Sequence, residues 1–125
     1  MIKFLGRLNR QDINNLYKNS RAGIVVYQPA PNHIDAQPIK LFEFMAAGLP
    51  VVASNFPLWK GIIEDSGCGI CVDPQDKNDV RNACVKLINN VDICHDMGKA
   101  GRKAVEERYN WNVEARKLLE LYENI

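Results

Sequence analysis

Apolar residues along the chain form two kinds of pattern that alternate with each other. Short continuous runs, bounded by Gly, Pro or Asp, predict strands. These runs lie at residues 2–5, 22–27, 51–53 and 69–72. Apolar residues at i, i+3 and i+4 predict helices between and after the strands. Asp12 and Asp76 are expected to be N-caps. The first predicted helix follows Asp12, and the others cover residues 39–47, 58–63, 76–88, 92–109 and 112–123.

The alternation of strands and helices predicts the fold class. Apolar runs without polar alternation are typical of strands buried on both faces, as in parallel sheets covered by helices. We therefore expect an α/β domain, a parallel sheet with helices on both faces. Ligands of such sheets bind beyond the carboxyl ends of the strands, near helix N-termini. That rule indicates the loop 28–38 with the helix after it, and the turn 54–57.

Composition and charge narrow the class of protein. The 125 residues suit one domain, and 46% are hydrophobic and 25% charged, as in ordinary globular proteins. The formal net charge is +1 without a basic cluster, so we expect no nucleic-acid partner. No apolar run approaches the roughly 20 residues that span a bilayer. The early charges between Met1 and Arg7 do not fit a secretory signal.

Four cysteines raise the question of a second chemistry. Cys68 and Cys71 match C-x-x-C, the spacing of redox pairs and of half a zinc site. No second such pair follows, and His33 and His95 lack a ligand-like spacing to it. The pair also borders a predicted strand, whereas redox thiols sit at helix starts. We favour half-buried thiols in a reducing, cytoplasmic compartment, without metal or cofactor; a redox or zinc protein is the alternative.

The stretch from Gln37 to Ser54 carries the main candidate site. A helix beginning at about Pro38 presents free N–H groups and partial positive charge, so its first turn could bind a phosphate. The Lys40 ammonium adds charge, and the Glu43 carboxylate, about one turn further, matches the paired hydroxyls of a ribose. On the residues alone, solvated Lys and Glu side chains are the more common interpretation of such a pattern.

The same stretch resembles a known signature. Residues 38–54, PIKLFEFMAAGLPVVAS, are similar to the P-x-K-L-x-E-Y-M-A-x-G-x-P-V-V-A-S pattern of glycosyltransferase family 4. Further similarities at residues 4–6, 69–74 and 109–111 extend the resemblance over nearly the whole chain. Members of this family are retaining enzymes that use nucleotide sugars and have two Rossmann-like domains in the GT-B arrangement. The resemblance implies an incomplete half of the second, Rossmann-like domain, which binds the donor.

The resemblance also assigns roles to residues of the site. Glu43 takes the place of the second of two acidic residues, which holds the ribose of the donor. Asp35, eight residues earlier, takes the place of the first, which contacts the transferred sugar. The place that meets the diphosphate corresponds to the backbone of Pro38, Ile39, Lys40 and Leu41. Two departures are an Asp one methylene shorter than the usual Glu, and the lack of the usual glycines in residues 35–38.

For function, the resemblance implies transfer of a sugar from a nucleoside diphosphate to a carbohydrate or lipid-linked acceptor with retention, as in polysaccharide biosynthesis. The implied partners are a nucleotide-sugar donor and an N-terminal acceptor domain that residues 1–125 do not contain. The Arg and Lys that neutralise the leaving diphosphate would lie upstream, and Arg7 does not replace them. We therefore expect the isolated chain to be inactive, and the intact enzyme to be cytoplasmic and able to associate peripherally with membranes.

An incomplete half of a Rossmann-like domain lacks the strands that normally precede the strand at 22–27. The strand that ends near Tyr27 should have an open edge, which either residues 2–5 or a second copy of the chain would cover. The alternative function is a non-catalytic α/β regulatory module that binds a phosphorylated ligand. A receiver domain of that kind has an acidic pair after its first strand, and this sequence has none there.

Overall fold

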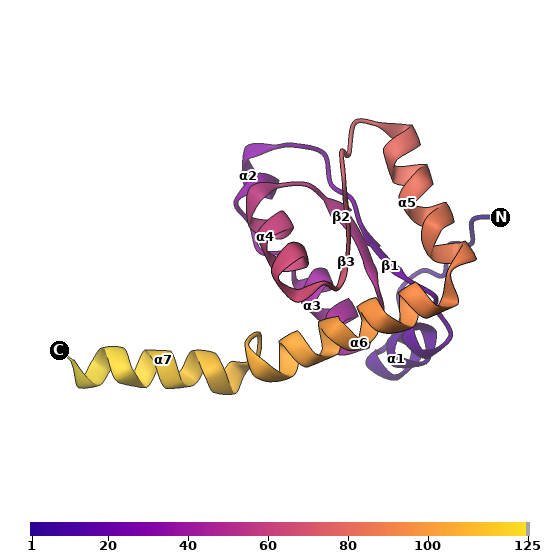
Figure 1. Cartoon of the computed structure of the whole chain (residues 1–125). Coiled ribbons are helices and arrows are strands. Elements are labelled where there is room, and N and C mark those ends of the chain that lie inside the picture. Colours follow the sequence, from indigo (N-terminus) through magenta and orange to yellow (C-terminus); the bar gives the residue numbers. More distant parts are fainter. Residues whose placement is uncertain (125) are drawn as a thin grey trace.

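A three-stranded parallel sheet forms the centre of the molecule (Figure 1). The computed structural model describes residues 1–124. Strands β1 (Gly23–Val25), β2 (Val51–Ser54) and β3 (Gly69–Val72) lie side by side in chain order. The helices are α1 (Arg10–Lys18), α2 (Pro31–Ile34), α3 (Ile39–Ala46), α4 (Pro57–Ser66), α5 (Lys77–Asn89), α6 (Val91–Glu107) and α7 (Trp111–Glu123).

Each face of the sheet has its own hydrophobic core. On one face, Val25 and Val51 pack with α3, α4 and the later part of α6. On the other face, Val52 and Val72 pack with α5 and the start of α6. β2 is buried at every position, which explains its unbroken apolar run. The predicted fold class, a Rossmann-like parallel sheet with helices on both faces, is confirmed.

Short polar side chains begin several of the helices. The Asp76 carboxylate accepts hydrogen bonds from the N–H groups of Asn78 and Asp79, as predicted. The cap expected at Asp12 was wrong, because α1 begins earlier. Its cap is Asn9, whose side chain accepts a 2.9 Å bond from the Asp12 N–H. Asp12 thus lies in the first turn, where its charge favours the helix dipole.

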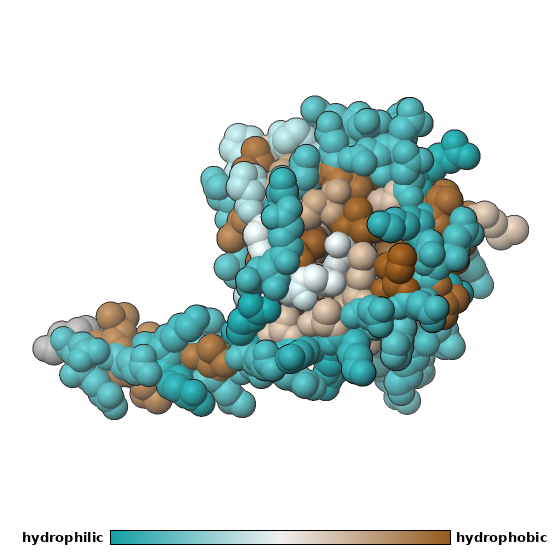
Figure 2. All heavy atoms as spheres, in the orientation of Figure 1, coloured by the Kyte–Doolittle hydropathy of each residue, from teal (hydrophilic) through white to brown (hydrophobic). Residues whose placement is uncertain are grey.

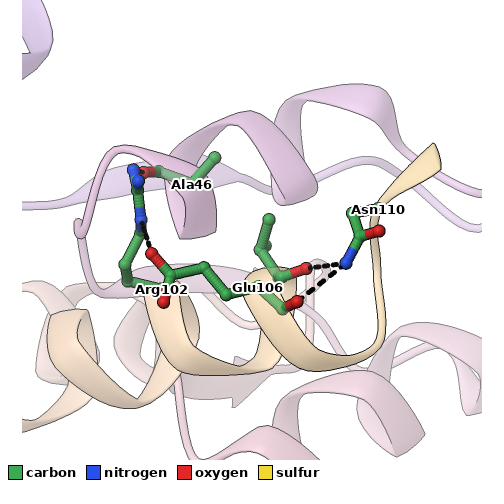
Figure 3. A network of polar contacts seen from close by, with 5 residues as sticks. Ala46, Arg102, Glu106 and Asn110 are labelled. Carbon is green, nitrogen blue, oxygen red and sulfur yellow. Dashed lines mark hydrogen bonds and ion pairs between the residues drawn. The ribbon is translucent and has the colours of Figure 1, made fainter. Parts of the chain in front are cut away.

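Close contact between α3 and α6 depends on two glycines. Gly48 ends α3 with a left-handed φ of 73°, and its carbonyl oxygen faces Gly98 of α6. A Cβ atom on Gly98 would lie 2.0 Å from that oxygen, so only glycine permits the approach. One turn later, the Arg102 guanidinium donates to the Ala46 carbonyl at the C-terminus of α3 and pairs with Glu106 (Figure 3). These contacts fix the C-terminal end of α3 against α6.

Two segments differ from the sequence-based expectation. Residues 2–5 form no strand, and Phe4 is almost fully exposed. A segment of four residues, here three apolar residues and Lys3, gains little from extended structure without a neighbouring strand to pair with. The stretch 28–38, expected to be a loop, contains the short helix α2. Pro31 stands at its first position, where a fixed φ and a missing N–H are tolerated.

The outer edge of β1 and the last helix are exposed. Within residues 1–124, β1 pairs only with β2, so residues 2–5 do not cover its other edge. Helix α7 extends away from the body of the molecule (Figure 1), and none of its described residues is buried. Figure 2 shows its hydrophobic residues in brown among hydrophilic ones in teal. Within the same part of the chain, no helix combines the length and apolar character needed to cross a bilayer.

Candidate functional site

The candidate site is built around the first turn of α3, beyond the carboxyl end of β1. Pro38 is the N-cap of α3 and has no N–H group. The Leu41 N–H donates to the Pro38 carbonyl at 3.1 Å. Among residues 1–124, the N–H groups of Ile39 and Lys40 have no hydrogen-bond partner, and both residues are exposed. Two free donors and the positive end of a helix dipole therefore meet at one surface point, a suitable site for an anion.

An aromatic cluster supports the loop before this turn. Trp59 of α4 is 0% exposed, and its indole Nε1–H donates to the Ala36 carbonyl at 2.6 Å. The Tyr27 ring lies 5.4 Å from the Trp59 ring and 5.1 Å from the His33 ring. The His33 Nδ1–H donates in turn to the Gln28 carbonyl at 3.0 Å. This cluster holds the backbone of residues 28–36 against the body of the protein.

The aromatic cluster also borders a hollow next to α3, which we call the aromatic hollow. Its volume is about 350 Å³. Its lining consists of Tyr27, His33, Ala36, Gln37, Pro38, Ile39, Lys40 and Trp59. The hollow is mostly apolar, with an imidazole, an amide and an ammonium group at its rim. Such a combination suits a small polar ligand that has apolar faces.

Glu43 lies one turn after Ile39 in α3 and is held by α1. Its carboxylate accepts a hydrogen bond from the Tyr17 hydroxyl at 2.9 Å through Oε2. Its other oxygen, Oε1, lies 3.3 Å from the Arg10 Nη1 atom. The Glu43 side chain is 30% exposed, so the carboxylate still reaches solvent. Burial, followed by the hydrogen bond to Glu43, raises the pKa of Tyr17, which therefore stays protonated and able to donate at neutral pH.

A second and larger hollow opens beside this carboxylate, and we call it the Glu43 hollow. It measures about 620 Å³ and lies between α1, α3 and α6. Three of its lining residues, Arg10, Lys18 and Arg102, are cationic. Ile39 lines both hollows, so they adjoin at the first turn of α3. The structure thus brings Glu43 and the free N–H groups of α3 to one continuous surface.

The other residues predicted for the site differ in their accessibility. Asp35 is the exposed C-cap of α2 and lines neither of the two hollows. The Lys40 side chain borders the aromatic hollow. Leu41 is fully buried and contributes only to the core through its side chain. The contribution of α1 was missed, although Arg10 and Tyr17 are seven residues apart and this spacing places them on one face of a helix.

The cysteine pair has no features of a reactive site. Cys68 is buried and Cys71 half-buried, and both are free thiols, one just before β3 and one within it rather than at a helix N-terminus. Burial is the main cause that raises the pKa of Cys71 to about 11. The thiolate needed for redox chemistry or metal binding is therefore disfavoured at neutral pH. No group of three potential ligands that could hold a metal ion occurs among the described residues.

The fold of the chain matches that of a solved structure over nearly its whole length. Sucrose-phosphate synthase from Thermosynechococcus elongatus superimposes with a TM-score of 0.83 and 25% identity, over 98% of this chain and 29% of that one. The class of protein is therefore that of the glycosyltransferases. The family model described as "Glycosyl transferases group 1" matches residues 1–104. The chain belongs to this family.

Similarities in sequence agree with this assignment. A phosphatidyl-myo-inositol mannosyltransferase from Mycobacterium leprae is 36% identical over 87 residues, which are 70% of this chain and 23% of the mannosyltransferase. A sucrose synthase from Denitrovibrio acetiphilus is 34% identical over 110 residues, 82% of this chain and 13% of the synthase. The chain thus spans about a quarter or less of these relatives. The predicted membership of a glycosyltransferase family is confirmed, and this membership favours that class of protein over the regulatory and redox alternatives.

Proposed function

We propose that this chain is the part of a retaining, family 4 glycosyltransferase of the GT-B arrangement that binds the nucleoside diphosphate of a sugar donor. Residues 1–125 would form an incomplete donor-binding domain with its C-terminal helices. The observation that carries the proposal is the free N–H pair of Ile39 and Lys40, flanked by one hollow with a carboxylate and another with aromatic walls. A nucleotide sugar has the matching order of groups: ribose, diphosphate and sugar.

In this arrangement each part of the donor has its own partner. The diphosphate accepts from the N–H groups of Ile39 and Lys40 and is balanced by the Lys40 ammonium. The ribose lies in the Glu43 hollow, where Glu43 accepts from its paired hydroxyls. A carboxylate has about four acceptor positions, and Tyr17 and Arg10 occupy two of them. The transferred sugar lies in the aromatic hollow, and Asp35, which precedes Ala36 of its lining, is the carboxylate proposed to contact that sugar.

The proposed reaction needs more than this part of the enzyme. Transfer requires an oriented acceptor hydroxyl and positive charge on the leaving phosphate. The amides of α3 supply part of the charge, whereas the acceptor would bind to an N-terminal domain. We therefore propose that the isolated chain binds donor without rapid transfer, and that the intact enzyme acts on a carbohydrate or lipid-linked acceptor. The free cysteines favour a cytoplasmic enzyme, which could associate with membranes peripherally.

Titration of uridine and guanosine diphosphates against the chain tests this proposal. Replacing Glu43 with alanine should weaken binding by about 1.5–3 kcal/mol, or roughly 10- to 150-fold in Kd, because hydrogen bonds to a charged acceptor are lost. Calorimetry measures this change. The matched control is Glu120→Ala, at an exposed position on α7, which should bind as the unchanged chain does. Equal affinity of the Glu43→Ala and unchanged chains would refute the role given to Glu43.

The open edge of β1 leads to a second proposal, about association. Because residues 2–5 do not cover this edge, we propose that a second copy of the chain does. The edge adjoins an apolar hollow of about 300 Å³, lined in part by Ile24 and Leu87. Sedimentation should show a dimer whose fraction rises with concentration. Ile24→Lys should reduce it, because lysine on an edge strand opposes pairing. The control Leu119→Lys, on exposed α7, should leave the dimer fraction unchanged. A monomer at every concentration would contradict the proposal.

A further inference from the structure

The contact between α1 and Glu43 points to a residue that controls the site by holding the Glu43 carboxylate. We propose that Tyr17 is a positioning residue that aims the Glu43 carboxylate at the ribose hydroxyls and thereby sets a preference for ribonucleotides over 2′-deoxyribonucleotides. This inference rests on the proposed function, because it assumes that a ribose lies in the Glu43 hollow. It concerns Tyr17 on α1, whereas the proposed function concerns Glu43 on α3, which binds the hydroxyls.

The two bonds to the carboxylate fix its orientation. Tyr17 donates to Oε2 at 2.9 Å, and Arg10 approaches Oε1 at 3.3 Å. With each oxygen held from α1, the carboxylate plane is fixed, although a glutamate side chain is otherwise flexible. The acceptor positions that Tyr17 and Arg10 do not occupy remain available to the hydroxyls of a ligand. Because Tyr17, Arg10 and Glu43 all line the Glu43 hollow, a ligand there meets a carboxylate that is already oriented.

Of the two contacts, the one from Tyr17 should dominate. The Arg10 side chain is 67% exposed and its contact is long, so salt screens it. The Tyr17 hydroxyl is part-buried and its bond is short. Its ring packs edge to face on Phe44, with 5.4 Å between the ring centres. Tyr17 is therefore held by the core on one side and holds Glu43 on the other.

The geometry of the carboxylate also explains why Tyr17 should affect the preference for ribose over 2′-deoxyribose. The two hydroxyls of a vicinal diol can each donate to a separate oxygen of one carboxylate only if both oxygens face the diol. A 2′-deoxyribose has lost one of these hydroxyls and leaves one acceptor unsatisfied. A carboxylate that can rotate makes one bond to either sugar almost equally well. Loss of the Tyr17 hydroxyl should therefore reduce the discrimination between the two sugars more than it reduces binding of the deoxy form.

A double-mutant cycle on the chain tests the inference. Dissociation constants are measured by calorimetry for uridine and guanosine diphosphates and for their 2′-deoxy counterparts. We expect the unchanged chain to prefer the ribose form about tenfold, the usual effect of one such hydrogen bond. Tyr17→Phe should reduce the preference to about threefold. Glu43→Ala should abolish it, and adding Tyr17→Phe to Glu43→Ala should change nothing further, because Tyr17 acts through Glu43.

Controls separate this role from a purely structural one. Tyr122→Phe, on exposed α7, makes the same chemical change away from the site and should keep the full preference. Melting temperatures show whether Tyr17→Phe is folded. If it is not, the same measurements are made with trimethylamine N-oxide, an osmolyte that favours the folded state. A folded Tyr17→Phe variant with unchanged preference overturns the inference. Absence of any preference in the unchanged chain, with no effect of Glu43→Ala, instead refutes the proposed function.

Discussion

Trp59→Ala should destabilise the chain by about 3–5 kcal/mol, the usual cost of removing a buried aromatic side chain. Trp59 is 0% exposed, and its ring packs edge to face on Phe56 with 4.8 Å between ring centres. The substitution also leaves the Ala36 carbonyl without the indole N–H that it accepts. Since domains of this size are stable by about 5–15 kcal/mol, such a loss would remove about one fifth or more of the free energy of unfolding.

Urea denaturation followed by circular dichroism measures this change. The chain contains a matched control, because its only other tryptophan, Trp111, is 73% exposed at the start of α7. Trp111→Ala should shift the free energy of unfolding by no more than about 0.5 kcal/mol. Similar losses for the two substitutions would mean that the aromatic cluster around Trp59 does not hold the domain together as described.

Gly98→Ala is the second substitution with a large expected effect. Alanine favours a helix interior over glycine by about 1 kcal/mol, which alone would stabilise α6. The new Cβ atom would, however, lie 2.0 Å from the Gly48 carbonyl oxygen, a backbone atom that cannot rotate away. The two helices must move apart, and overpacking of this kind costs about 1–3 kcal/mol and occasionally more. We expect a packing cost at the upper end of that range, and hence a net loss of about 2 kcal/mol after the gain in helix propensity.

The matched control for this substitution is Gly61→Ala. Gly61 lies inside α4, and an added Cβ there meets no atom within 4 Å. Only the helix propensity changes, so Gly61→Ala should raise the free energy of unfolding by about 0.5–1 kcal/mol. The two Gly→Ala substitutions should therefore shift the urea midpoint in opposite directions. A shift in the same direction would show that α6 can move away from α3 without cost.

Most of the fold could be predicted from the sequence because local pattern and tertiary structure agree. The run 51–53 is apolar at every position, and β2 is buried on both faces there. Asp76 precedes a helical pattern and is a cap in the structure. Residues 2–5 are mostly apolar, with Lys3 between Ile2 and Phe4, but they form no strand, since a strand depends on a neighbour that local sequence does not reveal. The early start of α1 was missed because two polar residues, Asn9 and Asp12, could each serve as its cap.

The candidate site was predictable only in part, for a related reason. The first turn of α3 is a local feature, and Pro38, Lys40 and Glu43 mark it in the sequence. The partner of Glu43, in contrast, is Tyr17, which lies 26 residues earlier and meets it only through tertiary folding. No periodicity within one helix records such a contact. The same holds for the bond from Trp59 to the Ala36 carbonyl, which shapes the aromatic hollow across 23 residues of chain.

The projecting position of α7 affects the stability of the helix itself. Its 13 residues have no buried side chain, so its helical state is stabilised locally, by the Asn110 cap and the Glu114–Lys117 ion pair. Helices of this length are marginal in water without tertiary contacts. Its amide hydrogens should therefore exchange with solvent much faster than those of α6, and any surface that covers its leucines would slow that exchange. The exchange rate of the α7 amides thus reports directly on whether another surface packs against this helix.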